Sequence, residues 1–115
     1  MILEFTEKFI QMCEEYISKN PDVATSVEEF VKRCGRLGLY NLKSIFGDCS
    51  PNTFKVTDGA VKNKGAVCKI YIPDEDYREV KSFLERKGVL RTVISFYYFS
   101  ILMVLLGYWK LPPKI

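Results

Sequence analysis

The sequence TVISFYYFSILMVLLGYW, residues 92–109, decides which fold and which environment can be assigned to this chain. Thr92 and Trp109 bound eighteen residues without a charge, and Arg91 and Lys110 flank them. An α-helix of that length is about 27 Å long, close to the thickness of the hydrocarbon core of a bilayer. The run is therefore long enough for one membrane-spanning helix.

The ends of the run also favour a membrane segment. Tyr108 and Trp109 lie where amphipathic rings favour the boundary between water and lipid. Basic residues gather on the amino-terminal side, where the positive-inside rule would keep them in the cytoplasm: Arg86, Lys87 and Arg91. Pro112 and Pro113 end any helix that reaches them. We expect a tail anchor, with the amino-terminal part of the chain facing the cytoplasm.

Two other positions for the same run stay open, a buried core element and a subunit interface. Residues 92–99 are rich in β-branched and aromatic side chains, which also suit a buried strand. A short apolar run cannot be assigned to helix or strand by periodicity alone. Residues 92–99 are therefore left open between helix and strand.

The rest of the chain predicts three helices, then a hairpin, then a fourth helix. Residues 2–18 carry an apolar stripe at helical spacing. Ser26 and Glu29 form a capping box before a helix over residues 27–34, and Gly35 and Gly38 then indicate a turn before a short helix over residues 39–46.

Two strands are predicted next, over residues 53–57 and 66–72, joined by a glycine-bounded hairpin loop over residues 58–65. In the second strand, Cys68 and Ile70 share one face and Lys69 points away. The fourth helix covers residues 74–87, with Asp74 as its N-cap and Gly88 after its basic end.

The expected fold is α+β, with residues 1–90 as one small domain and residues 91–115 as a C-terminal apolar segment that is either a membrane anchor or a core or dimer helix. The predicted order over residues 2–72 resembles that of a winged-helix module. The resemblance implies that the short third helix, with Tyr40, Asn41 and Lys43, enters a DNA groove. It also implies that the hairpin contacts phosphates through a second set: Lys55, Lys62, Asn63, Lys64 and Lys69.

The sequence predicts no catalytic, cofactor or metal site. With no histidine in the chain, the usual base for a serine or cysteine nucleophile is missing. No glycine-rich phosphate loop occurs. The four cysteines form no Cys-x-x-Cys pair and are interpreted as reduced, mostly buried thiols: Cys13, Cys34, Cys49 and Cys68.

Two hypotheses on function follow. The first is a small non-enzymatic protein, held at a membrane and acting as an interaction or accessory subunit, which contacts other proteins through the hairpin lysines or through the basic region of residues 78–91. Those cations would also attract anionic lipid. The alternative is a cytoplasmic winged-helix-like regulator that binds nucleic acid and forms a homodimer through the C-terminal segment. The net charge of +3 gives the alternative little electrostatic support.

Overall fold

The computed structural model describes residues 1–47, 53–59 and 65–114 of the chain. Within them, two strands and four helices follow one another as β1 (Ile2–Thr6), α1 (Glu7–Lys19), α2 (Val27–Phe46), β2 (Val67–Tyr71), α3 (Asp74–Lys87) and α4 (Val93–Leu105). The fold is α+β, but the predicted order of three helices, a hairpin and a fourth helix is wrong. The winged-helix order is therefore absent from the described residues.

The chain begins with a strand, where a helix was predicted. Leu3 and Phe5 are buried while Ile2 and Glu4 are exposed, so the side chains alternate with the period of two that a strand imposes. Thr6 ends the strand and caps α1, because its hydroxyl accepts a hydrogen bond from the N–H of Phe9. The apolar stripe predicted over residues 2–18 therefore combines one strand face with one helix face.

The small sheet joins the two parts of the chain that lie on either side of α1 and α2. β1 pairs with β2 in antiparallel register, from Ile2 opposite Tyr71 to Thr6 opposite Val67. The predicted hairpin is wrong, because residues 53–57 form no strand with β2 and contribute only an isolated bridge between Thr57 and Thr92. In β2 the predicted faces are confirmed, with Ile70 buried and Lys69 exposed.

α2 is one helix of twenty residues rather than two helices joined by a turn. Its start is the predicted one, since the hydroxyl of Ser26 accepts a hydrogen bond from the N–H of Glu29. Gly35 and Gly38 lie inside the helix, on the side that faces α4. A Cβ atom at Gly35 would lie 2.3 Å from Cε1 of Tyr97, so this glycine permits a close helix contact.

α3 covers the residues predicted for the fourth helix, but its N-cap is not the predicted one. Its N-cap is Pro73, which makes no side-chain capping hydrogen bond. Asp74, the predicted cap, instead forms an ion pair with the amino group of Met1, which donates a hydrogen bond of 2.9 Å to Oδ1 of Asp74. Gly88 closes the helix in the left-handed conformation, with φ of 64°.

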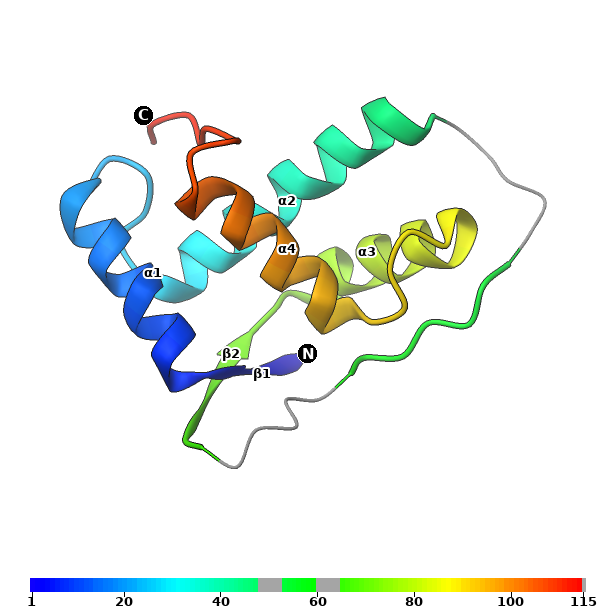
Figure 1. Ribbon diagram of the computed structural model, residues 1–115, viewed down its shortest axis with the longest axis horizontal. Coiled ribbons are helices and arrows are strands. Elements are labelled where there is room, and N and C mark those ends of the chain that lie inside the picture. The colour runs from blue at the N-terminus through cyan, green and yellow to red at the C-terminus, as the bar shows by residue number, and fades with distance from the viewer. Residues whose placement is uncertain (48–52, 60–64, 115) are drawn as a thin grey trace.

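α4 lies in the core, and Figure 1 shows it crossing in front of α2 and α3. Residues 92–99, left open between helix and strand, are helical from Val93, and Thr92 caps the helix by accepting a hydrogen bond from the N–H of Ser95. The side that packs inward consists of hydrophobic side chains and one serine: Val93, Ile94, Phe96, Tyr97, Ser100, Ile101 and Val104. Much of the uncharged run is therefore buried inside the protein.

The segments that follow α1 and α4 are tied together. The guanidinium of Arg33 donates hydrogen bonds to the carbonyls of Val23 and Pro112, over 2.5 and 2.7 Å. The Lys114 ammonium forms an ion pair of 2.7 Å with the Glu29 carboxylate. These contacts fix the tail after α4 against the start of α2.

Candidate functional site

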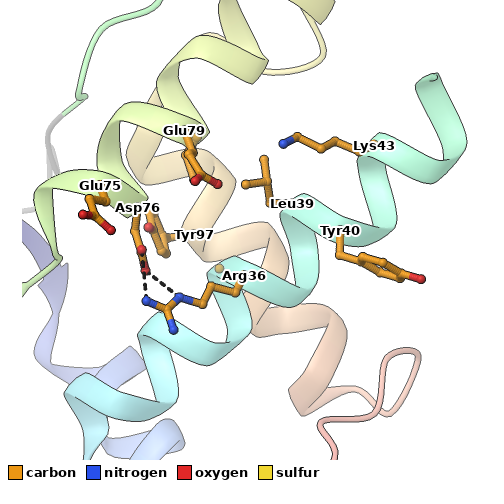
Figure 2. Close-up of a pocket in the computed structure, with 10 residues that line it drawn as sticks. Arg36, Leu39, Tyr40, Lys43, Glu75, Asp76, Glu79 and Tyr97 are labelled. Carbon is orange, nitrogen blue, oxygen red and sulfur yellow. Dashed lines mark hydrogen bonds and ion pairs between the residues drawn. The ribbon is translucent and has the colours of Figure 1, made fainter. Parts of the chain in front are cut away.

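A pocket of about 380 Å³ opens between α2 and α3 (Figure 2). α2 contributes Arg36, Leu39, Tyr40 and Lys43 to its lining, and α3 contributes a set of carboxylates: Glu75, Asp76 and Glu79. Tyr97 reaches the pocket from α4. The pocket thus combines both signs of charge with an apolar and aromatic interior.

Two of these charges are already paired with each other. Nε of Arg36 lies 3.0 Å from Oδ2 of Asp76, and its Nη2 lies 3.2 Å from Oδ1, so the contact is bidentate. The hydrogen bonds to Asp76 raise the pKa of Arg36 above its ordinary value. Because Arg36 is largely exposed, the pair contributes no more than about 1 kcal/mol to stability. It closes one end of the pocket.

Tyr97 is a buried phenol and a poor candidate for acid–base chemistry. Burial raises the pKa of its hydroxyl well above the ordinary value. The phenol therefore stays neutral at physiological pH and offers a hydrogen-bond donor or acceptor to whatever enters the pocket. This arrangement is suited to binding rather than to proton transfer.

A second hollow, of about 370 Å³, adjoins the first and shares Lys43 and Glu79 with it. Eight of the described residues line it: Lys43, Gly47, Arg78, Glu79, Ser82, Phe83, Arg86 and Lys87. Four of these eight are cations and one is an acid, so we call it the basic hollow. It runs along α3 towards the ends of α2 and α3. Its charge suits an anionic ligand.

A third depression, of about 160 Å³, is almost entirely apolar and lies on the other side of the end of α2. Its lining comes from α2, from the connection between α3 and α4, and from α4: Leu42, Phe46, Val89, Leu90 and Phe99. Next to it the outer side of α4 continues with Leu102 and Leu106. We call the set Phe46, Phe99, Leu102 and Leu106 the apolar face.

The four side chains of the apolar face are all exposed. The exposed fraction is 49% for Phe46, 36% for Phe99 and Leu102, and 66% for Leu106. Along α4, the positions 99, 102 and 106 fall on one side of the helix. In Figure 1 no helix or strand covers the near side of α4. Exposed apolar surfaces of this kind mark places where proteins bind other molecules or lipid.

The two residues that bound the uncharged run lie in different surroundings. Thr92 is the N-cap of α4, and Trp109 lies beyond its end, where its ring makes an edge-to-face contact of 5.5 Å with Phe99. Of the helices that the structure describes, none has both the length and the apolar character needed to cross a bilayer.

The residues predicted to bind nucleic acid are spread over several elements. Tyr40, Asn41 and Lys43 lie on the second half of α2, and only Tyr40 and Lys43 line the pocket of Figure 2. Lys55 is exposed in the extended segment 53–59, and Lys69 is exposed on β2 opposite Glu4. Lys62, Asn63 and Lys64 lie outside the described residues. The third helix and the wing of the prediction are therefore not found among the described elements.

Sequence reasoning named the region of residues 78–91 as a partner surface but did not find the two walls of the basic hollow. Arg78, Ser82 and Arg86 are spaced four residues apart, and this spacing indicates that they lie on one side of a helix. The pairing of that side with Lys43 depends on how α2 crosses α3, which the sequence pattern does not encode.

The cysteines form no site among the residues that the structure describes. Cys13 and Cys34 are fully buried, and Cys68 is half-buried. Burial raises the pKa of the Cys13 thiol to about 12 and raises that of Cys34 as well. These thiols are therefore protonated and unreactive in the folded protein. Within the described part of the chain, no group of three or more histidine, cysteine or acidic residues is placed to hold a metal ion. Cys49 lies outside it.

Comparison of the chain with protein-family models, with curated proteins and with solved structures finds no match.

Proposed function

We propose that this chain is a small non-enzymatic interaction protein that associates with the surface of a membrane. The observation that carries the proposal is the apolar face, which lies on the outer side of an element that otherwise forms the core. The apolar face is exposed to solvent along α4. It extends to the end of α2, because Phe46 and Phe99 both line the apolar depression.

The surroundings of the apolar face suit a lipid surface that carries negative charge. Arg91 and Lys110 are exposed at the two ends of the uncharged run, and Lys43 and Arg86 are exposed beside the end of α2. Each such cation contributes about 1 kcal/mol near an anionic leaflet. Tyr108 and Trp109 follow α4 with rings of the type that gather at membrane interfaces.

The same cations disfavour a second copy of the chain as the occupant of this face. A two-fold dimer brings one patch against its own equivalent, so like charges at the margin of the patch would approach each other. A bilayer surface buries the four apolar side chains without that repulsion. Each partly exposed side chain would then contribute on the order of 1 kcal/mol, enough together for weak, reversible association.

Co-flotation of the full chain with lipid vesicles tests the proposal. The protein should float with vesicles of phosphatidylcholine and phosphatidylglycerol, and the double variant Leu102→Asn with Leu106→Asn should lose at least tenfold in partitioning. Leu106→Asn alone, at the more exposed position, tests the same face with less risk to the fold. Met12→Asn is the matched control, since Met12 is 48% exposed on α1, outside the apolar face.

Two results would contradict the proposal. One is a wild-type chain that floats with no vesicle. The other is a chain whose concentration-dependent dimer, measured by light scattering, is abolished by Leu106→Asn, since that result would assign the apolar face to a second copy.

A further inference from the structure

The basic hollow presents cations from two helices around one concave surface. On α3, Arg78, Ser82 and Arg86 occupy successive turns of one side. Lys43 completes the opposite wall from α2, and the buried Phe83 contributes to the lining between them. These side chains therefore line one concave surface with several hydrogen-bond donors.

Part of the positive charge of the basic hollow is not neutralised by ion pairs within the described part of the chain. Lys43 and Arg86 make no ion pair there, and Glu79 is the single acid in the lining. Asp74, which lies one helical turn before Arg78 and attracts it electrostatically, forms its ion pair with the amino group of Met1. An anion that enters the basic hollow would thus meet cations that retain binding capacity.

The ordinary role of cations at helix ends explains only part of this arrangement. Lys43 and Arg86 lie in the last turns of α2 and α3, where positive charge stabilises the exposed carbonyl groups. Arg78 lies near the start of α3, where the helix dipole favours the opposite sign. Arg78 is attracted to Asp74, four residues earlier, but it makes no ion pair within the described residues, so its N–H donors can bind a further group.

We propose that the basic hollow binds a phosphate group. The guanidinium groups of Arg78 and Arg86 present parallel N–H donors that match phosphate oxygens, and the hydroxyl of Ser82 adds a neutral donor. The Lys43 ammonium adds a point charge from the facing helix.

The position of the basic hollow identifies the phosphate as that of an anionic phospholipid headgroup. Lys43 lines the basic hollow and Phe46, one turn further along α2, lines the apolar depression. A lipid that meets this end of α2 would place its headgroup near Lys43 and its acyl chain near Phe46. This identification rests on the proposed membrane association, whereas the phosphate site itself does not.

The test compares charge removed from the basic hollow with charge removed elsewhere. Arg78→Gln with Arg86→Gln should lower binding to phosphatidylglycerol-containing vesicles at least tenfold, and should leave the weaker binding to pure phosphatidylcholine unchanged. The matched control is Lys8→Gln with Lys19→Gln, which removes the same charge from exposed positions of α1. It should change binding less than threefold. Circular dichroism verifies that each variant is folded.

The outcomes separate the phosphate site from the proposed function. If the Arg78 and Arg86 variant binds phosphatidylglycerol vesicles like the wild type, while Leu106→Asn abolishes flotation, the phosphate site is wrong and the membrane association stands. If no vesicle binds but inorganic phosphate shifts the amide resonances of Ser82 in the wild type alone, the phosphate site stands and the lipid source is wrong. Salt-sensitive binding of a DNA duplex without vesicle binding, lost in the same variant, would assign the phosphate to nucleic acid and overturn the lipid proposal.

Discussion

The hydroxyl of Tyr77 on α3 donates a hydrogen bond to the carboxylate of Asp58 in the extended segment 53–59. The backbone carbonyl of Asp58 accepts a second hydrogen bond, of 3.0 Å, from the N–H of Ile94 at the start of α4. One residue of an irregular segment therefore connects two helices.

The Tyr77–Asp58 contact predicts a specific loss of stability at alkaline pH. The hydrogen bond to Asp58 raises the pKa of Tyr77 to about 12 from its ordinary value near 10. The folded state holds the phenolic proton more tightly than the unfolded state, so this contribution is complete below pH 10 and is lost as the pH rises towards 12. Thermal unfolding of Tyr77→Phe between pH 9 and 12 should show a smaller fall in melting temperature than the wild type.

Tyr71→Phe is the control for this measurement, because Tyr71 is an exposed phenol on β2. It should retain the wild-type dependence on pH. Identical alkaline profiles for Tyr77→Phe and the wild type would show that the hydrogen bond does not contribute to folding.

A second prediction concerns the close contact of α2 and α4. A Cβ atom at Gly38 would lie 2.1 Å from the Ser100 hydroxyl oxygen, so Gly38→Ala must push the two helices apart. We expect a loss of about 1–2 kcal/mol in urea unfolding, since overpacking outweighs the gain in helix propensity. Ser44→Ala, at an exposed position of the same helix, should change stability by less than about 0.5 kcal/mol.

A double variant at Gly38 and Ser100 tests whether this contact causes the loss of stability. Its hydroxyl is buried and has no hydrogen-bond partner within the described part of the chain. In the Gly38→Ala background, Ser100→Gly removes the clashing oxygen and should restore part of the lost stability. A double variant no more stable than Gly38→Ala would show that the two positions are not coupled.

A third prediction concerns the tail that follows α4. Arg33→Ala removes both hydrogen bonds that join α2 to the carbonyls of Val23 and Pro112. We expect a loss of about 1–2 kcal/mol in urea unfolding and faster proteolytic cleavage near Lys110, because fewer contacts then hold the tail. Lys32→Ala removes the same charge from the neighbouring position of α2 and should leave cleavage unchanged.

Local patterns in the sequence predicted several elements correctly. The cap that Ser26 forms on the N–H of Glu29, the end of α3 at Gly88 and the faces of β2 all depend on residues within one or two turns of each other. Errors arose where distant contacts decide the outcome. Gly35 and Gly38 were interpreted as a turn, whereas their small size serves the approach of α4.

In the candidate site, too, the local properties could be predicted from the sequence and the contacts between distant residues could not. The basic character of residues 78–91 was visible in the sequence, as was the apolar character of α4. The basic hollow and the apolar depression require the end of α2 to lie between α3 and α4, which is a property of helix crossing. The predicted nucleic-acid set assumed a third helix and a hairpin that the described residues do not form.

The pairing of β1 with β2 has a kinetic consequence. The paired residues are separated by about 60 to 70 positions, so the sheet closes a loop that contains α1 and α2. During synthesis, α1 and α2 emerge long before β2 does. Until then β1, which includes Leu3 and Phe5, has no partner strand. Formation of the sheet is thus expected to be a late event of folding, whose rate depends on closing that long loop rather than on the helices within it.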